Sequence, residues 1–491
     1  MTLTASSKSR EIRTRVGHPI IDADGHMVEF GPPLEDYVRK IGGSDYAVQF
    51  VGHPRRWGKS DEDRLANRQT MLSWWVPPTV NTLDRATVQL PKLLHERMPE
   101  LGLDYAVLYG TFISRTYNTK NPKDPDAARI GLRAANTYKM DMYREFADRL
   151  TPAIGVSMAT PQTALDDLNY AVDVLGAKVI NIQHVWRPNK PIWDKYPDIG
   201  QFNFGIFDYR GMWTDNFGID SPYDYDPFWK ACLEKKVAIT GHGTALGFTT
   251  HASPTNHCYN HLGAFAEAGE ALCKALFFGG VTRRFPNLKI ALLEGGVSTG
   301  ARIYCDLFSH WEKRGAKGIQ NCNPAHLDHA LFTKLNKQYG GRWVESKADR
   351  ILSGSAGGVP EDLTGLELDD FARCGITKKE DIRDLFVPHF FFGCEADDPM
   401  NKTAFDRKML PFGVHLNAIF SSDMGHWDVP DMSEMVEEAY ELVEKELINE
   451  EDFKEFTFTN AVKFFAGSNP DFFKGTAIES EVNRAIKAGL K

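Results

Sequence analysis

Acidic and histidine side chains follow directly on short apolar segments at several places in this 491-residue chain. In the first, HPIIDADGHMVEF, the apolar start predicts a buried strand that ends in Asp22, Asp24, His26 and Glu29. Asp24 and His26 are two residues apart, so in extended backbone both side chains point the same way and can reach one metal ion. Glu29 is placed to serve a second ion or to brace the first ligands. The alternative is a polar loop in which Asp22 or Asp24 caps a turn.

The same pattern recurs at the ends of later predicted strands. AKVINIQH ends at His184, VAITGH at His242, LKIALLEGG at Glu294 and NAIFSSD at Asp423. The glycines around His242 let the backbone approach a ligand closely. Each of the other three has a structural alternative, because His184 can pack under an insertion and the two carboxylates can cap the helices that follow.

Eight short apolar strands separated mostly by helices predict an α/β fold, a (β/α)8 TIM barrel with large lid insertions and C-terminal helices. Right-handed crossovers make all eight strands parallel, so their carboxyl ends form one catalytic face. The side chains predicted to converge on one cavity at that face are Asp24, His26, His184, His242, Glu294 and Asp423.

The predicted barrel takes up most of the chain. We expect residues 1–17 to form a flexible N-terminal arm, residues 18–468 the metal-dependent barrel, and residues 469–491 a C-terminal tail. The insertions into the barrel are expected at about 40–80, 186–223 and 302–379.

Composition restricts the partners and the compartment. The net charge of −9 and the lack of a basic run argue against a nucleic-acid partner. No apolar run approaches the ~18 residues that a membrane span needs. The seven cysteines include no C-x-x-C pair, and the N-terminal segment MTLTASSKSREIRTR is polar. These features predict a cytoplasmic protein without a disulfide framework.

Four segments resemble the amidohydrolase superfamily, in its amidohydrolase 2 branch: IIDADGHMVEF, VAITGHG, FFGGVTRRFPNLKIALLEGGV and IFSSDMGHWD. The resemblance implies a metal-bearing (β/α)8 barrel. It also implies ligands from strands one, five and eight, which correspond to Asp24, His26, His242 and Asp423. In dinuclear members, groups on strands four and six complete the site, here His184 and Glu294.

The departures from the family pattern guide the functional prediction. The first strand carries D-x-H where typical hydrolases have H-x-H, and its D-x-H-x-x-E start resembles the dinuclear-iron oxygenase members. This resemblance favours two divalent metal ions, preferably Fe with Mn or Zn as alternatives, since imidazole and carboxylate without thiolate suit these metals. The second ion would be held by His184, with Glu29 or Glu294 bridging. The favoured function is a non-haem diiron monooxygenase that hydroxylates a small organic acid or thioester.

Two other functions remain open. The first is a metal-dependent hydrolase or decarboxylase using a metal-bound hydroxide, with Asp423 accepting the proton. The second is a non-catalytic barrel retained as a partner subunit, against which the complete ligand set argues. The candidate catalytic residues are Asp423, Glu294, His257 and His261, the last two being solvated loop histidines in the alternative interpretation.

The insertion at 186–223 is rich in aromatic residues and carries several basic ones. Such a surface predicts a small-molecule substrate that is apolar or aromatic and has an acidic group. The alternative is that these aromatics only pack the insertion against the barrel. The C-terminal helices offer a surface for a possible homo-oligomer.

Overall fold

Parallel strands form a closed ring at the centre of the protein. The computed structural model describes residues 7–44, 60–67, 70–71, 79–111, 125–195, 212–243, 253–315, 317–352 and 369–489. Around the ring the strands are β1 (Ile21–Met27), β2 (Tyr105–Gly110), β3 (Leu150–Pro152), β4 (Ile154–Gly155), β5 (Val179–Ile182), β8 (Ala238–Gly241), β9 (Ile290–Leu292), β10 (Phe390–Cys394) and β11 (Asn417–Phe420). Every pair of ring strands joined by ladder hydrogen bonds is parallel.

Two details turn the strands into an eight-stranded barrel. Strands β3 and β4 follow one another directly and serve as one third strand, interrupted at Ala153, whose amide donates to the Leu108 carbonyl at 2.8 Å. The first and last strands are joined beyond their ends, because the Asp423 amide donates to the Asp24 carbonyl at 3.1 Å. The His26 amide likewise donates to the Met424 carbonyl at 2.9 Å. The predicted (β/α)8 barrel is confirmed.

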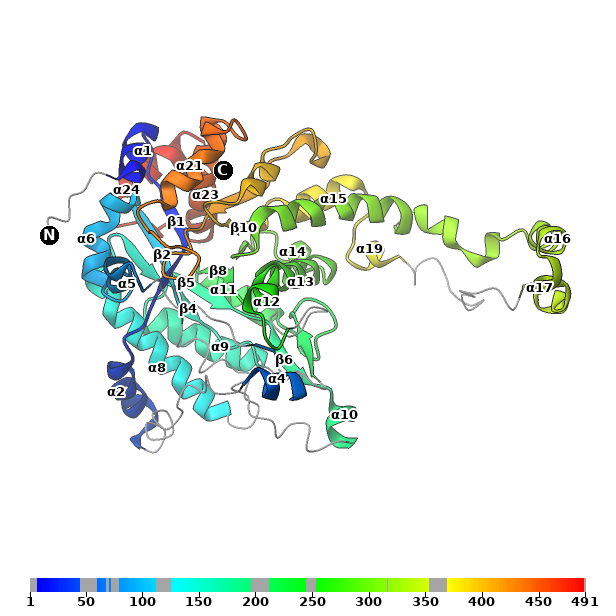
Figure 1. Ribbon diagram of the computed structural model, residues 1–491, viewed down its shortest axis with the longest axis horizontal. Coiled ribbons are helices and arrows are strands. Elements are labelled where there is room, and N and C mark those ends of the chain that lie inside the picture. Colours follow the sequence, from blue (N-terminus) through cyan, green and yellow to red (C-terminus); the bar gives the residue numbers. More distant parts are fainter. Residues whose placement is uncertain are drawn as a thin grey trace.

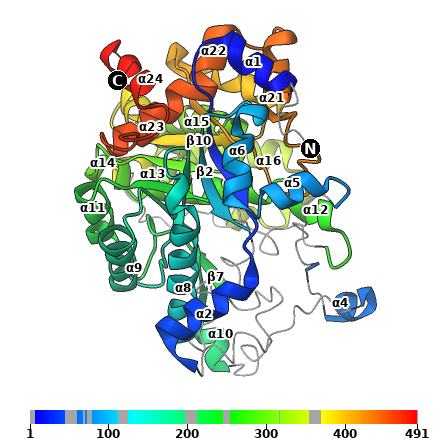
Figure 2. The same cartoon turned by 90° about the vertical axis from the view of Figure 1, so that its left-hand side faces the viewer.

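Helices cover the outside of the ring (Figures 1 and 2). Those that follow the barrel strands are α2 (Gly31–Gly42), α4 (Asp61–Asn67), α5 (Thr82–Thr87), α6 (Pro91–Leu101), α8 (Pro125–Tyr143), α9 (Pro161–Asn169), α11 (Asp226–Glu234), α12 (His257–His261), α13 (Ala264–Phe278), α14 (Val281–Arg284), α15 (Gly296–Arg314), α19 (Asp370–Arg373), α20 (Lys379–Phe386), α21 (Met435–Glu444), α22 (Glu450–Lys454) and α23 (Asn460–Ser468). Strand β10 is followed instead by two 3-10 turns, η7 (Pro399–Ala404) and η8 (Pro411–Gly413). No helix of the described residues has the length and apolar character that crossing a membrane requires.

The amino-terminal end of the barrel is closed by the C-terminal segment. Tyr105, at the start of β2, packs edge-on against Phe472 and Phe473, both of them buried. The segment then forms helix α24 (Glu479–Lys487). Residues 469–491 were expected to be a tail, but their described part is folded because the open end of a barrel exposes apolar side chains that need a cover.

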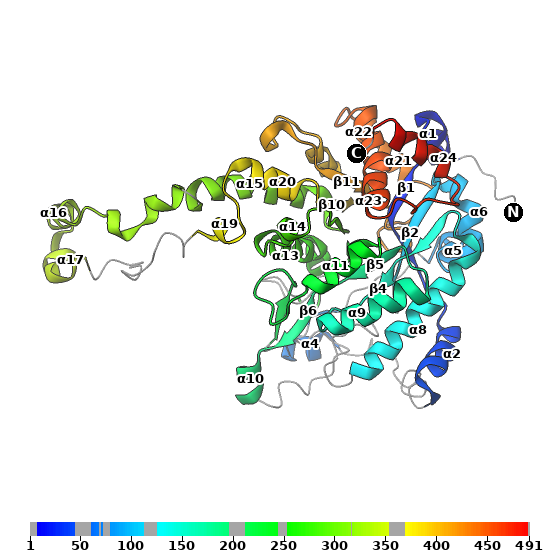
Figure 3. The ribbon, with the colours of Figure 1, turned by 180° about the vertical axis from the view of Figure 1, so that it is seen from behind.

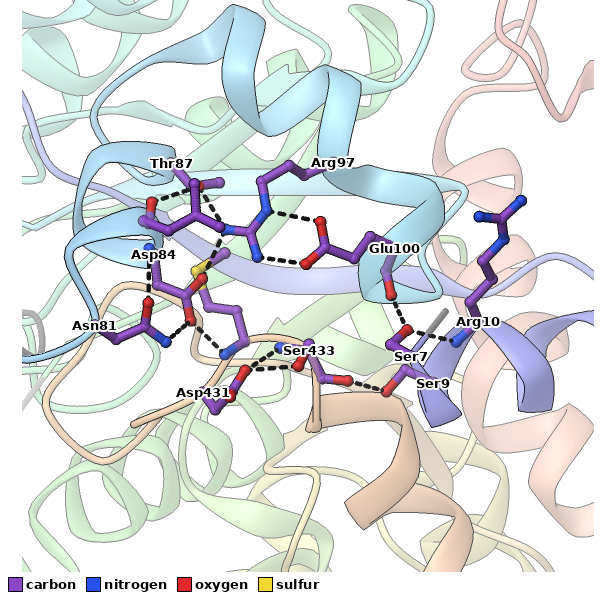
Figure 4. A network of polar contacts seen from close by, with 12 residues as sticks. Ser7, Ser9, Arg10, Asn81, Asp84, Thr87, Arg97, Glu100, Asp431 and Ser433 are labelled. Atoms are coloured by element: carbon purple, nitrogen blue, oxygen red, sulfur yellow. Dashed lines mark hydrogen bonds and ion pairs between the residues drawn. The ribbon is translucent and has the colours of Figure 1, made fainter. Parts of the chain in front are cut away.

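Residues 8–16 also differ from the predicted flexible arm, since they form helix α1 (Lys8–Val16). Helix α1 packs against α21 (Figure 2). The Ser7 hydroxyl donates to the Glu100 carbonyl, and the buried Ser9 hydroxyl donates to the Ser433 carbonyl at 2.6 Å (Figure 4). These long-range contacts hold a segment whose polar composition alone predicts no fixed position.

The predicted insertions are only partly covered by the described residues. Within 186–223, strand β6 (Val185–Pro188) pairs antiparallel with β7 (Met212–Asp215), and helix α10 (Lys190–Lys195) lies between them in the chain. The aromatic-rich stretch at 196–211 and most of the insertion at 40–80 lie outside the described residues. The insertion predicted to begin at 302 begins later, because α15 runs unbroken to Arg314.

Replacing Arg97 with methionine is expected to destabilise the barrel by about 3–5 kcal/mol, because it leaves two carboxylates without their cation. Arg97 is buried, and its guanidinium contacts Asp84 at 2.6 Å and Glu100 at 2.8 Å (Figure 4). Urea unfolding measures the loss. Arg302→Met is the matched control, because the Arg302 pair with Glu270 is exposed and is worth at most about 1 kcal/mol. Equal losses in the two variants would contradict this interpretation.

Candidate metal centre

Six side chains that can bind a metal gather at the carboxyl ends of the barrel strands. Asp24 and His26 lie in the second half of β1, His242 directly follows β8, and Glu294 and Asp423 lie beyond the ends of β9 and β11. The sixth is His426, in the turn after Asp423. They form two overlapping groups, each with ligand atoms within 4.8 Å of one another: Asp24, His26, His242 and Glu294, and His26, Glu294, Asp423 and His426.

His26 stands at the centre of this arrangement. Its Nε2 atom lies 3.1 Å from Asp423 Oδ1, 3.2 Å from Glu294 Oε1 and 3.6 Å from Asp24 Oδ1. His242 Nε2 faces the same Glu294 oxygen at 3.3 Å and the same Asp24 oxygen at 3.6 Å. His426 Nδ1 contacts Asp423 Oδ1 at 2.6 Å. Imidazole nitrogens and carboxylate oxygens therefore converge on one small buried volume.

The backbone is bent to present these side chains. Glu294 and Asp423 both adopt the left-handed conformation, with φ of 56° and 51°, which costs a non-glycine residue free energy. The pairing of β1 with β2 shifts register between Asp22 and Gly25. A Cβ atom on Gly25 would lie 2.6 Å from Met424 Cε and 2.7 Å from Asp22 Oδ2, so a larger residue would require both side chains to shift. Conformations of this kind persist where the surrounding structure imposes them, and they cluster at functional sites.

Asp22 fixes the end of β1 to the segment after β11. Its carboxylate accepts hydrogen bonds from the Ser422 amide at 3.0 Å, the Ser422 hydroxyl at 2.6 Å and the Asp24 amide at 3.1 Å. Burial raises the pKa of Asp22 to about 6, although these three hydrogen bonds oppose the shift. Asp22 is thus a bracing group, and it leaves Asp24 free to face the cluster.

Burial and mutual charge shift the pKa values in the cluster. Burial raises the pKa of Asp24 well above its ordinary value, and the nearby Glu294 carboxylate adds to that shift. Burial acts to lower the pKa of His242, but the Glu294 and Asp24 carboxylates outweigh it and raise that pKa to about 9. Burial acts to raise the pKa of Glu294, but the facing imidazoles, His242 above all, hold it well below its ordinary value.

The donor set fits a divalent metal ion. Both carboxylate oxygens of Asp24 are buried and have no hydrogen-bond partner among the described residues. Burying such oxygens is costly unless a cation or a donor compensates them. Three carboxylates and three imidazoles without a thiolate suit Mn, Fe or Zn. A divalent ion bound among them would satisfy atoms that otherwise only face one another.

Further acidic side chains surround the cluster. Glu395 directly follows β10, and burial together with the Glu294 carboxylate raises its pKa to about 8. Asp428, five residues after Asp423, also has a raised pKa, with burial as the main cause. With a pKa of about 8, the Glu395 carboxyl holds a proton at neutral pH beside the cluster.

Four of the residues predicted for the site belong to neither of the two ligand groups found among the described residues: Glu29, His184, His257 and His261. His184 packs edge-on against Trp186, with ring centroids 4.6 Å apart, and lines a small cavity with Gln183. His257 and His261 lie on α12 and face Trp427 edge-on, with ring centroids 5.7 and 5.5 Å away. Their assignment as catalytic residues stays a prediction.

Glu29 follows β1 but turns toward helix α8. A Cβ atom on Gly110, at the end of β2, would lie 2.3 Å from Glu29 Oε1, so Glu29 lies against that strand end. Its charge acts on Lys139, a buried α8 residue whose ammonium donates to the Ala153 carbonyl at 2.9 Å. Burial lowers the pKa of Lys139 to about 8, although Glu29 opposes the shift. Glu29 therefore lies between the end of β2 and helix α8.

Lys139→Met is expected to change how stability depends on pH. A lysine whose pKa is 10.5 when unfolded and about 8 when folded makes stability rise with pH between these values, and that contribution is lost as pH falls through 8. The variant lacks this slope, so its advantage over the parent chain shrinks by about 3 kcal/mol between pH 8 and 10.5. Urea unfolding across this range measures it, with the exposed Lys92→Met as control. If stability depends on pH in the same way in Lys139→Met and in the parent, the ammonium of Lys139 is not destabilised by burial.

Comparison with known proteins identifies the family. The sequence profile described as Amidohydrolase matches residues 21–318, more than half of the chain. The chain belongs to the amidohydrolase family. The matched region includes β1, β8 and β9, and with them Asp24, His26, His242 and Glu294. No curated protein matches the sequence significantly.

The chain is also similar to several solved structures. A dihydroxybenzoic acid decarboxylase from Polaromonas sp. JS666, with bound manganese and the inhibitor 2-nitroresorcinol, is 15% identical, with 91% of this chain and 97% of that one covered and a TM-score of 0.46. A 2,6-dihydroxybenzoate decarboxylase from Rhizobium is 13% identical, with coverages of 91% and 98% and a TM-score of 0.44. A 4-oxalomesaconate hydratase from Rhodopseudomonas palustris is 13% identical, with coverages of 96% and 98% and a TM-score of 0.41.

Proposed function

We propose that this chain is a metal-dependent hydrolase or lyase with one divalent ion in the barrel mouth. The observation that carries the proposal is the overlap of the two ligand groups, which share His26 and Glu294. Because all ligand atoms of each group lie within 4.8 Å of one another, one ion between them can be reached by either set. The proposed ligands are Asp24, His26, His242, Glu294, Asp423 and His426.

The chain's own residues would handle the proton. A divalent ion at this site supplies Lewis acidity toward an oxygen of the substrate or of water. Burial and the Glu294 carboxylate raise the pKa of Asp423 well above its ordinary value, which makes this carboxylate a stronger proton acceptor than a solvated aspartate. His426 Nδ1, 2.6 Å from Asp423 Oδ1, orients that carboxylate. Asp423 is the proposed general base, and Glu294 fixes the three imidazoles.

The diiron monooxygenase, which the D-x-H-x-x-E start favours, is the less well supported candidate. It requires a second ion held by His184, with Glu29 or Glu294 bridging. His184 and Glu29 belong to neither ligand group of the described residues, and Glu29 faces Lys139. The geometry therefore favours the hydrolase or lyase.

The proposed substrate is a small organic acid with an apolar or aromatic body. The support is the aromatic and basic composition of residues 186–223. Within the described part, Arg187 is engaged by Asp215 at 2.5 Å and by the Tyr225 hydroxyl at 2.9 Å. Arg187 therefore stabilises the β6–β7 pair. A substrate carboxylate would be bound by another cation or by the proposed metal.

Metal analysis together with an oxygen electrode tests the proposal. The chain is produced in medium supplied with Mn, Fe and Zn and is then offered a panel of aromatic and aliphatic carboxylic acids and their esters. We expect about one divalent ion per chain, hydrolysis or loss of CO2 for a member of the panel, and no uptake of O2. Two irons per chain with substrate-dependent O2 consumption would instead support the monooxygenase. A chain that binds no metal under any of these conditions would refute both enzymes.

A further inference from the structure

A helical segment projects far from the barrel. Helix α15 begins against the barrel and carries the chain outward, and helices α16 (His329–Tyr339) and α17 (Gly341–Glu345) lie beyond its distal end (Figures 1 and 3). We call residues 317–352 the extension. Neither α16 nor α17 has a buried residue, whereas the first half of α15 packs into the core.

The extension exposes an apolar stripe. Leu331, Leu335 and Tyr339 recur at four-residue spacing along α16, with exposed fractions of 50%, 43% and 75%. Trp343, four residues further on in α17, is 76% exposed. Residues four apart lie on one face of a helix, so the three α16 side chains form one continuous surface. Trp343 lies beyond the break between α16 and α17 and adds a further exposed aromatic ring to the extension. An exposed apolar patch of this kind marks an interaction site.

The extension does not have the means to be stable alone. Helices shorter than about 12–15 residues are marginal in water unless an apolar face is packed. Units below about 40 residues usually need disulfides, metals or oligomerisation to fold. The stripe therefore needs another protein surface to pack against. Helix α15 holds the extension away from the barrel of its own chain, so that barrel does not supply this surface (Figure 1).

The distribution of charge indicates which surface packs against the stripe. The extension contains six lysines and arginines and three aspartates and glutamates, a net charge of +3, whereas the whole chain carries −9. The rest of the chain therefore carries −12. The extension of one copy is attracted by the body of another copy and repelled by another extension.

We propose that the extension docks on the body of a second copy of this chain, and that the second copy returns the same contact. A two-fold dimer of this kind buries both stripes with one symmetric interface. The extension is large enough, since a stable interface involves about 20–30 residues on each side. This proposal concerns assembly and does not depend on the reaction that the metal centre performs.

Analytical ultracentrifugation of the full chain tests the proposal. The stripe variant is Leu335→Ser/Tyr339→Ser/Trp343→Ser, and the matched control Leu83→Ser/Leu90→Ser alters exposed apolar residues on the body. We expect the parent and the control to be dimers at micromolar concentration. The dimer dissociation constant of the stripe variant should rise by about 100-fold or more, with its metal content unchanged. A monomeric parent chain, or a stripe variant that dimerises like the parent, would overturn the proposal.

Chemical cross-linking locates the contact. Isotope-labelled and unlabelled copies are mixed, and lysine-reactive cross-links from Lys334 and Lys337 of one copy are identified by mass spectrometry. We expect cross-links between the extension of one label and the body of the other, in smaller yield at high salt because screening weakens the attraction. Cross-links only between two extensions would rule out docking on the body. A failure of the proposed enzymatic function would appear in the metal content and turnover, which this experiment leaves untouched.

Discussion

Replacing His26 with alanine is expected to lower metal affinity by more than about 100-fold while the barrel stays folded. Loss of a group that merely supports a ligand costs 10–100-fold in affinity, and a ligand itself costs more. His26 belongs to both ligand groups, and its Nε2 atom faces Asp24, Glu294 and Asp423 within 3.6 Å. Elemental analysis and competition with a chelator measure the affinity, and far-UV circular dichroism reports the fold.

His184→Ala is the matched control for that variant. His184 is also a buried histidine just beyond the end of a barrel strand, but it lies outside both ligand groups of the described residues. We expect this variant to bind metal like the parent chain. Loss of one of two ions in His184→Ala would restore the dinuclear site predicted from the sequence. Full metal binding by His26→Ala would remove the basis of the proposed centre.

The barrel and most of its rim can be predicted from the sequence because buried parallel strands consist of continuous runs of apolar residues. VAITGH and NAIFSSD each combine a β-branched or aromatic core with a polar residue at the end, and the structure places His242 and Asp423 at the same mouth. Such a pattern fixes which residues leave the strand on the cavity side. It does so for Asp24, His26 and Glu294 as well.

Glu29 shows where the pattern stops being informative. Its position three residues after His26 is within reach of the centre only if the chain keeps its direction. Strand β1 ends at Met27, and the next residues turn toward α8, where Glu29 lies near Lys139. Strand ends are uncertain by a few residues in any reading of periodicity, so spacing alone cannot decide which way such a side chain points.

His426 was not among the predicted ligands, and the structure places it in the second of the two ligand groups. It reaches the centre through a turn that begins with Asp423 in the left-handed conformation, and periodicity contains no information about that turn. The signal available in the sequence is D-M-G-H, in which a glycine with φ of 97° at Gly425 lets the chain fold back. A glycine between two potential ligands is therefore as informative for predicting a metal site as the end of a strand.

The termini differ from the predictions because their order comes from distant contacts. Helix α1 has a polar composition, yet Ser9 is buried against the segment before α21. Phe472 and Phe473 are the only strongly apolar pair in the last stretch of the chain, and they close the amino-terminal end of the barrel. Tertiary contacts of this kind override local composition.

Metal affinity is expected to rise by up to 10-fold per pH unit between about pH 6.5 and 9. The pKa of His242 is raised to about 9, so below that value a proton occupies the imidazole that a metal needs in its neutral form. The folding stability of the metal-free chain depends on pH in the opposite direction. A raised pKa adds stability that is complete below pH 6.5 and is lost as pH rises through 9. The increase in Tm on adding Mn or Zn should therefore grow over this range.

Isothermal titration in two buffers of different ionisation enthalpy counts the protons released, and we expect about one per metal ion bound at pH 7.5. The variant Glu294→Gln tests the cause of the raised His242 pKa, because the Glu294 carboxylate is the main group that raises it. In the metal-free variant, NMR should show the His242 imidazole titrating at lower pH than in the parent. An affinity that is flat from pH 6.5 to 9 would mean that His242 is already neutral. That result is incompatible with two carboxylates within 3.6 Å of its Nε2 atom, and the arrangement of the centre would have to be revised.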